Sequence, residues 1–252
     1  MSTMKQAITT TCVLGSLLMT FGPSVAQAAI ALDRTRAILN AGEKSMSMNV
    51  TNQNKQVPYL VQGWLEDDKG NKVNSPLTVL PPVQRLEPGA KTQIKVQGLP
   101  AAAQLPQDRE SLFFFNLREI PPRSDKPNTL QIALQTRIKL FYRPQAIAMT
   151  QHDIDNPWQE KLTLQRQGDR YQVNNPTPYY VTLSDGGSSK GANISGFEAV
   201  MVAPKSSAML NVAASKLGNA PVLTYINDWG GRAQLPFSCQ GSSCQVVPAK
   251  RS

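Results

Sequence analysis

Apolar and polar residues alternate over one unusually long stretch of the chain, from Leu130 to Pro144. The apolar positions of this alternation are Leu130, Ile132, Leu134, Ile138, Leu140 and Tyr142, with Thr136 as the one interruption. A period of two residues predicts a β-strand. The stretch is longer than the usual strand of about six residues, and an apolar edge of that length invites pairing with another chain. The alternative is an interior strand of a sandwich, with Arg137, Lys139 and Arg143 as solvated charges on its other face.

Shorter alternating stretches precede this one and are separated by turn residues. The pattern predicts strands at 46–50, 59–65, 94–96 and 111–120, among others. The stretch 77–86 contains Pro81 and Pro82, which cannot donate to a strand ladder, so it predicts an edge strand or a broken one. Seven short strands with turns between them are typical of an immunoglobulin-like β-sandwich. No long helical pattern competes with that interpretation.

The remaining chain continues in the same style and predicts a second all-β domain. Candidate strands occur at 162–164, 171–183, 194–202, 209–212, 223–229 and 233–247. Strand periodicity stops between Pro144 and Asn156, which predicts a domain boundary there. We expect a first domain over 29–147 and a second over 148–252, each about the size of a typical small domain.

The first 28 residues are typical of a secretory signal peptide. Lys5 supplies the positive region, 7–21 the apolar core, and Ala26-Gln27-Ala28 a small-x-small cleavage site. The apolar core is shorter than the roughly 20 residues that span a bilayer. We therefore expect an exported chain that does not span the membrane.

Two cysteines, Cys239 and Cys244, remain once Cys12 leaves with the signal peptide. In an oxidising compartment this close pair predicts a disulfide across the turn of a hairpin, with Gly241 and the serines in the bend. Metal binding is the alternative, but the chain has one histidine and no second cysteine pair. We expect no metal site.

The chain is basic after removal of the signal peptide, with 25 lysines and arginines against 17 acidic residues. The cations are dispersed and aromatic residues make up only 6% of the chain, so no nucleic-acid surface is indicated. Anionic surfaces or carboxylates are the expected partners. The single His152 stands in the interdomain region, and both remaining cysteines are assigned to the disulfide. The glycine-rich stretch 186–191 is explained as a hairpin loop, so we expect neither a catalytic site nor a cofactor.

Several segments resemble those of one family, the PapD-like periplasmic pilus assembly chaperones. They are L-D-R-T-R-A at 32–37, P-P-V-Q-R-L-E-P-G-A-K at 81–91, L-P-Q-D-R-E-S-L-F-F-F-N-L-R-E-I-P-P-R at 105–123, L-Q-I-A-L-Q-T-R-I-K-L-F-Y-R-P at 130–144, N-P-T-P-Y-Y-V-T at 175–182 and Y-I-N-D-W-G-G-R at 225–232. The resemblance covers nearly the whole mature chain and is densest in the first domain.

This resemblance implies a boomerang of two immunoglobulin-like domains that caps pilus subunits, both pilins and tip adhesins, in the periplasm. It also implies delivery of those subunits to an outer-membrane usher. By the same resemblance, Arg36 and Lys139 bind the C-terminal carboxylate of the subunit. Leu130, Ile132, Leu134 and Ile138 would be the donor-strand side chains that complete the subunit's unfinished sandwich. The loop 121–129 resembles that of the short-loop subclass, which serves rod-like pili.

A third set of residues, Glu110, Arg143 and Asp228, matches an interdomain charge network that sets the angle between the domains. Because a slip of one residue turns every strand side chain over, the two cations could act as a register stop. Strict alternation places Lys139 on the face opposite Leu130 to Leu134, so we expect a bulge, a strong twist or an edge-on approach. An exposed apolar edge also makes a self-capping homodimer of the free chaperone plausible.

Two other classes of function compete with a chaperone. A structural pilus subunit or adhesive sandwich domain would need an incomplete fold and its own donor extension, whereas this mature chain starts within a few residues of its first strand. A carbohydrate-degrading enzyme would show turnover that a single carboxylate substitution abolishes. Mixing with a pilin separates the first two classes, because a chaperone forms a one-to-one complex and a subunit polymerises.

Overall fold

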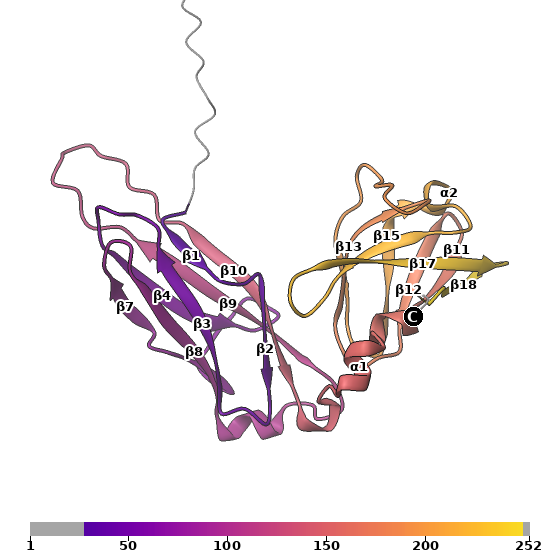
Figure 1. Ribbon diagram of the computed structural model, residues 1–252, viewed down its shortest axis with the longest axis horizontal. Coiled ribbons are helices and arrows are strands. Elements are labelled where there is room, and N and C mark those ends of the chain that lie inside the picture. The colour runs from indigo at the N-terminus through magenta and orange to yellow at the C-terminus, as the bar shows by residue number, and fades with distance from the viewer. Residues whose placement is uncertain (1–27, 249–252) are drawn as a thin grey trace, which may run out of the picture.

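The structure of the chain is a computed structural model that describes residues 28–248. The predicted signal peptide, residues 1–28, lies outside the described residues except for Ala28. The described chain forms two β-sandwiches that meet at one end and lean apart from there, so the molecule is bent (Figure 1). The prediction of two all-β, immunoglobulin-like domains is confirmed.

Two sheets make up the first sandwich. One has the order β1 (Ile30–Leu32), β3 (Ser45–Asn52), β8 (Lys91–Gly98) and β6 (Leu77–Leu80). The other has the order β2 (Arg36–Asn40), β10 (Gln135–Arg143), β9 (Ser111–Ile120), β4 (Tyr59–Glu66) and β5 (Lys72–Val73), and β7 (Val83–Leu86) also pairs with β4. A short 3-10 helix, η1 (Pro100–Gln104), connects the two sheets between β8 and β9.

Alternation along these strands fills one core between the two sheets. Met48 and Val50 of β3 lie fully buried opposite residues of β9 such as Phe115. Residues at the intervening positions of β3 are exposed or partly exposed. The period of two in the sequence therefore marks the residues that hold this sandwich together.

The N-terminal segment passes from one sheet of the first sandwich to the other between β1 and β2. β1 pairs with β3 in an antiparallel manner, whereas β2 pairs with β10 in parallel. The change falls at 33–35, where the polar residues Asp33, Arg34 and Thr35 interrupt the apolar alternation of the sequence. As a result Arg36 begins β2 on the opposite sheet from Ile30.

The stretch 77–86 is broken at its two prolines, as one of the two sequence-based alternatives predicts. β6 precedes Pro81 and pairs with β8, and β7 follows Pro82 and pairs with β4 in the other sheet. Prolines lack the N–H that a continuous ladder would need, so the strand divides between the two layers at this point.

The prediction of one long strand over Leu130–Pro144 is wrong for residues 130–134. β10 begins at Gln135, and residues 129–134 have no regular secondary structure. Together with 121–128 they form the long loop at the upper left of Figure 1. The backbone N–H of Glu119 still donates to the Leu134 carbonyl, so the loop leaves the sheet immediately before β10. The alternating pattern persists where this chain supplies no neighbouring strand.

A linker of short helices joins the sandwiches. It contains η2 (Gln145–Ile147), α1 (Gln151–Asp155) and η3 (Trp158–Lys161). Thr150 caps α1, because its hydroxyl accepts from the Asp153 N–H while the Asp153 carboxylate accepts from the Thr150 N–H. We propose a domain boundary between residues 147 and 148, which stand in this linker. None of the helices among residues 28–248 has the length and apolar character needed to cross a bilayer.

The second sandwich is one continuous sheet that folds over on itself. Its order is β14 (Val200–Val202), β13 (Val181–Gly187), β16 (Val222–Ile226), β17 (Arg232–Gln240), β18 (Ser243–Val246), β11 (Thr163–Gln167), β12 (Arg170–Asn175) and β15 (Ser206–Ala213). β17 belongs to both layers: it pairs with β16 as far as Pro236 and with β18 from Phe237. A short helix, α2 (Ala214–Leu217), follows β15.

Candidate functional site

The edge of β10 is only partly covered by its own chain. On one side β9 pairs with it from Gln135 to Tyr142. On the other side β2 pairs with it only from Lys139 to Arg143. Among the described residues no strand covers that second side at 135–138. These residues and the exposed segment before them, Leu130 to Leu134, are called the open edge below.

Arg36 and Lys139 stand where the open edge ends. They are the first paired residues of the parallel β2–β10 ladder. Their neighbours Ala37, Ile138 and Leu140 point into the core of the first sandwich, so alternation directs Arg36 and Lys139 to the opposite face of the sheet. That face looks toward the second sandwich, and the two cations reach residues of it.

Each cation makes one hydrogen bond across the domain junction. Arg36 Nη1 donates to the Ile226 carbonyl at 3.0 Å, and Lys139 Nζ donates to Thr182 Oγ1 at 3.1 Å. Thr182 and Ile226 are themselves paired across β13 and β16. One cross-strand pair of the first domain therefore contacts one cross-strand pair of the second.

The electrostatic environment of these cations is unfavourable. Burial lowers the pKa of Lys139, and the positive charge of Arg36 lowers it further. Burial also lowers the pKa of Arg36, against the attraction of Asp228 and Glu110. Neither cation forms an ion pair with a carboxylate of residues 28–248. The buried Nε of Arg36 has no hydrogen-bond partner, so an anion placed here would meet both unneutralised charge and a free donor.

The strand parity problem raised by the sequence has a simple solution in the structure. Lys139 lies on the face away from the core, as alternation requires, and no bulge interrupts β10 between Gln135 and Tyr142. Leu130, Ile132 and Leu134 precede the strand, so the ladder of β10 does not fix their direction. Their side chains are 85%, 65% and 40% exposed.

Ile138 must be removed from the set of predicted donor side chains. It is only 7% exposed and belongs to the core of the first sandwich. In the sequence, Ile138 continues the alternation of Leu130, Ile132 and Leu134. In the structure, β10 begins at Gln135, so Ile138 lies in the strand and the other three residues precede it. Of the four predicted residues, only the three earlier ones are exposed.

The predicted interdomain network is present as a set of ion pairs. Arg143 Nη2 lies 2.7 Å from Glu110 Oε1 and 2.9 Å from Asp228 Oδ2. Arg143 Nε also donates to Glu110 at 3.0 Å. Glu110 and Arg143 come from the first sandwich and Asp228 from the second, so the arginine bridges the two domains. The Tyr180 N–H of the second domain donates to the other oxygen of Glu110 at 2.8 Å.

Burial and pairing oppose each other in this network. Burial raises the pKa of Glu110 to about 7, although Arg143 and the Tyr180 N–H act in the other direction. Burial lowers the pKa of Arg143, but the charges of Glu110 and Asp228 outweigh it and leave that pKa above its usual value. The Arg143 guanidinium also lies 4.9 Å from the centre of the Tyr179 ring.

The other candidate residues lie away from these two groups. Cys239 and Cys244 form the predicted disulfide across the β17–β18 turn. His152 lies on α1 in the linker and is exposed. Within residues 28–248 no three histidine, cysteine or acidic side chains gather in a way that could hold a metal ion.

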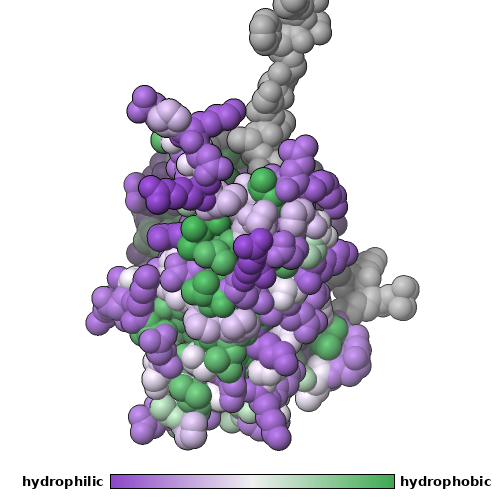
Figure 2. Space-filling view, turned by 90° about the vertical axis from the view of Figure 1, so that its left-hand side faces the viewer, coloured by the Kyte–Doolittle hydropathy of each residue, from purple (hydrophilic) through white to green (hydrophobic). Residues whose placement is uncertain are grey.

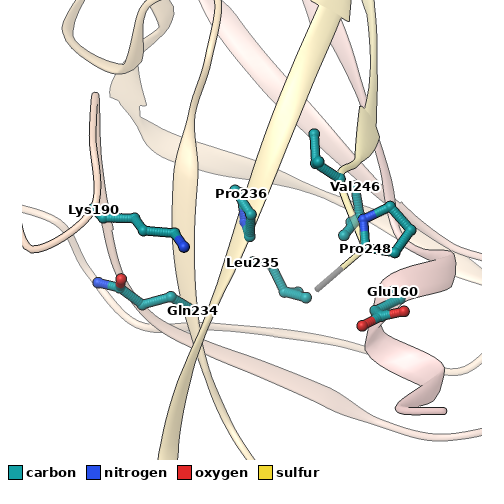
Figure 3. A pocket seen from close by; sticks show the side chains of 8 residues that line it. Glu160, Lys190, Gln234, Leu235, Pro236, Val246 and Pro248 are labelled. Atoms are coloured by element: carbon teal, nitrogen blue, oxygen red, sulfur yellow. The ribbon is translucent and has the colours of Figure 1, made fainter. Parts of the chain in front are cut away.

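Several hollows lie outside the predicted sites, among them one on each sandwich. One is in the second sandwich beside β17 and β18, with Lys190 and Gln234 on one side and Glu160 on the other (Figure 3). The other is on the first sandwich and is lined by Pro58, Tyr59, Leu60, Arg85, Ile120, Pro121, Pro122 and Arg123. On the face of the molecule seen in Figure 2, several hydrophobic groups lie along the middle among polar residues.

Thr182 and Tyr180 are site residues that sequence reasoning missed. Both lie in the stretch N-P-T-P-Y-Y-V-T, which resembles the family without indicating a role for either residue. Their bonds to Lys139 and Glu110 join positions 43 and 70 residues apart. No local pattern reports such pairs.

Comparison with known proteins gives matches over both domains. The family model described as "Pili and flagellar-assembly chaperone, PapD N-terminal domain" matches residues 29–148. The model described as "Pili assembly chaperone PapD, C-terminal domain" matches residues 157–237.

Similar curated proteins are fimbrial chaperones. The chain is 52% identical to the probable fimbrial chaperone YfcS of Escherichia coli K12, over 92% of this chain and 91% of that protein. It is 50% identical to the chaperone protein PapD of Escherichia coli, over 94% of this chain and 98% of that protein.

Solved structures of similar shape include the periplasmic chaperone SfaE, with a TM-score of 0.67 and 32% identity over 82% of this chain and 98% of that one. The SafB chaperone of Salmonella enterica, solved in complex with the SafA pilin, gives a TM-score of 0.69 and 26% identity over 83% of this chain and 96% of the matched chain.

Proposed function

Because the chain belongs to the PapD family of pilus assembly chaperones, we propose that it caps pilus subunits through the open edge of β10. A subunit that lacks one strand exposes an apolar groove and unpaired backbone groups. The open edge supplies what both need: a free strand edge at 135–138 and exposed side chains at Leu130, Ile132 and Leu134. This is strand addition, a recognised way for one protein to bind an extended segment of another.

The observation that carries this proposal is the position of Arg36 and Lys139 at the end of the open edge. A strand that pairs with the edge must stop where β2 begins. If it runs parallel to β10, its C-terminal carboxylate arrives at the two cations. If it runs antiparallel, its N-terminal ammonium arrives there instead, which buried positive charge disfavours. The cations therefore favour a parallel partner that ends at its own C-terminus.

The energetic roles of the two parts differ. Burial of three large apolar side chains contributes on the order of 4 to 9 kcal/mol before the cost of ordering the loop. Charge-assisted hydrogen bonds to a carboxylate contribute about 1.5 to 3 kcal/mol each. The apolar residues thus supply most of the affinity, and the cations fix the register of the partner strand.

The wider setting follows from the same membership. The SafB chaperone was solved with the SafA pilin, which supports pilus subunits as partners of this chain. We place the chain in the periplasm, where the predicted signal peptide would send it, and we expect it to pass pilins and tip adhesins to an outer-membrane usher. When no subunit is bound, a second copy of the chain could cover the open edge.

The test is capture of a pilus subunit by Lys139→Met and Arg36→Ala variants. We expect both variants to fold and to fail in co-purification with a co-expressed pilin. Lys139→Met should unfold at the same or a higher temperature than the wild type, because it removes a partly buried cation that has no carboxylate partner. Lys95→Met, which changes an exposed lysine of the other sheet, is the control and should capture normally.

Two results would contradict the proposal. Wild-type capture by either variant would show that the cations do not anchor the partner. Polymers of the chain with pilin, in place of a one-to-one complex, would favour the alternative of a structural pilus subunit.

A further inference from the structure

Three cations lie on the same sheet face as Arg36 and Lys139 but are not part of that pair. They are Lys72 on β5, Arg118 on β9 and Arg137 on β10, and all three are exposed. They are called the cation stripe below. Arg137 precedes Lys139 by two positions on one strand, so the stripe begins about 7 Å from the buried pair.

Aromatic rings hold the stripe in place. Lys72 Nζ lies 4.6 Å from the centre of the Trp64 ring, and the Arg118 guanidinium lies 5.3 Å from the same ring. The Arg137 guanidinium lies 3.4 Å from the centre of the Phe114 ring. Trp64 is only 9% exposed and is not part of the core between the sheets. The cations therefore cover it on the outer face.

The carboxylate of Glu66 pairs with one cation of the stripe, Arg137. Glu66 accepts from Trp64 Nε1 at 2.9 Å and from Arg137 Nε at 3.0 Å. The side chains of Arg118 and Lys72 form no ion pair within the described part of the chain. Arg143 of β10 lies on this face as well, but Glu110 and Asp228 neutralise it. Apart from Arg143, and with Arg36 and Lys139 included, these strands present five cations and one carboxylate on this face.

We propose that the cation stripe binds acidic side chains on the body of the captured subunit and speeds capture. The inference rests on the proposed function, because a subunit strand on the open edge at 135–138 brings the rest of the subunit beside Arg137. Stacking on rings fixes the cations in advance, so little side-chain entropy is lost when carboxylates arrive. Exposed charges of one sign act mainly on the association rate.

The experiment measures capture rates of a denatured pilus subunit by stopped-flow fluorescence. The subunit is the pilin used in the co-purification test of the proposed function, and it is diluted from urea into an excess of the chaperone. The test variant combines Lys72→Gln, Arg118→Gln and Arg137→Gln. The control combines Lys44→Gln, Lys91→Gln and Lys95→Gln, which removes the same charge from exposed positions at the other sheet.

We expect the test variant to capture the subunit about tenfold more slowly than the wild type at low salt. The two rates should converge at high salt, where screening removes the long-range attraction. The dissociation rate should change less than the association rate. The control variant should capture at the wild-type rate, and equal unfolding midpoints would show that all three proteins are folded alike.

Other outcomes would overturn the inference. Equal capture rates for the test and control variants would show that position on this face is irrelevant. If the test variant captured normally but lost binding to vesicles of phosphatidylglycerol and phosphatidylethanolamine, the stripe would serve a membrane surface instead. If the wild type and the test variant capture the subunit at the same rate, this inference alone is overturned. If the wild type captures no subunit, the proposed function is overturned as well.

Discussion

Buried charge takes two forms among the residues of this protein, and the difference separates structure from function. Arg143 has a carboxylate on each side and joins the two domains. Arg36 and Lys139 are adjacent cations with no carboxylate partner among the described residues. An unpaired charge that is wholly or partly buried costs free energy, so this second arrangement supports the proposal that a carboxylate ligand supplies the missing negative charge.

The buried Glu110 should make the stability of the protein depend on pH. Its pKa in the folded protein is raised from 4.5 to about 7 by burial. Between these pH values the folded state binds more protons than the unfolded state, so this group's contribution to stability is present below pH 4.5 and is lost as the pH rises to 7. The free energy of unfolding of the wild type, relative to Glu110→Gln, should fall by about 3 kcal/mol over that interval.

Urea unfolding at several pH values measures this difference directly. Glu43→Gln, an exposed glutamate of the same domain, is the control and should track the wild type at every pH. A difference between wild type and Glu110→Gln that stays constant from pH 4.5 to 7 would show that Arg143 and the Tyr180 N–H keep Glu110 ionised throughout.

At the scale of elements, β10 and the segment before it share one alternating pattern, which the proposed function divides between two proteins. Ile138→Ala should destabilise the free chain by about 2 to 5 kcal/mol, because it opens a cavity in the core. Ile132→Ala should leave the free chain unchanged, because that side chain is 65% exposed. It should instead release a bound subunit on the order of tenfold faster or more.

Thermal unfolding of the free chain and dissociation of the purified complex separate the two effects. The assignment of Ile132 to the partner's core would be wrong if Ile132→Ala lowered the unfolding midpoint as much as Ile138→Ala does. It would also be wrong if the Ile132→Ala complex dissociated at the wild-type rate.

This division explains which parts of the fold the sequence could predict. Period-two alternation reports strands that pair within the chain, and the two sandwiches and the break at Pro81 and Pro82 follow from it. The same alternation continues through Leu130 to Leu134, where the chain has no strand of its own to pair with. A pattern of apolar positions cannot say whose core they fill, so the predicted strand came out too long and included Ile138 with the wrong set.

Candidate site residues were predictable only through resemblance to the family. Nothing local distinguishes Arg36 from a solvated strand arginine. Its bond to the Ile226 carbonyl joins positions 190 residues apart. Such contacts depend on how the two domains meet, which hydrophobic periodicity does not encode.

In both sandwiches a buried asparagine at the end of a strand binds several backbone groups through its side chain. The sequence shows no internal repeat that would predict this similarity. Asn52 closes β3, and its side-chain amide donates to the carbonyls of Val57, Leu86 and Glu87. Asn175 closes β12, and its amide donates to the carbonyls of Tyr179, Val202 and Ala203. In each case the Oδ1 atom accepts from the backbone N–H two residues later.

These asparagines should be far more sensitive to substitution than their surroundings. Asn175→Ala leaves several carbonyls without a donor, and we expect a loss of about 2 to 4 kcal/mol in the free energy of unfolding. Asn174→Ala, at the exposed neighbouring position, is the control and should cost less than about 1 kcal/mol. Urea unfolding checks both, and equal losses would argue against a special role for Asn175.

At the scale of the whole molecule, the domains meet at several places. They include the buried network around Arg143, the hydrogen bonds of Arg36 and Lys139, and the tip of the β16–β17 turn. At that tip a side-chain carbon added at Gly230 would lie 2.6 Å from Thr35 Oγ1 in the first domain. Gly230 also has a φ of +84°, a conformation that residues with a side chain rarely adopt. The turn can therefore approach the first domain closely only with glycine at this position.

Gly230→Ala should thus loosen the junction while leaving each sandwich folded. We expect a wider distribution of interdomain angles by small-angle X-ray scattering, weaker subunit capture, and far-ultraviolet circular dichroism like that of the wild type. Combining Gly230→Ala with Thr35→Gly removes the contact but keeps the strained backbone. Recovery of the wild-type scattering in this double variant would assign the effect to the contact. A Gly230→Ala protein with wild-type scattering and capture would mean that the close approach of Gly230 to Thr35 does not set the angle between the domains.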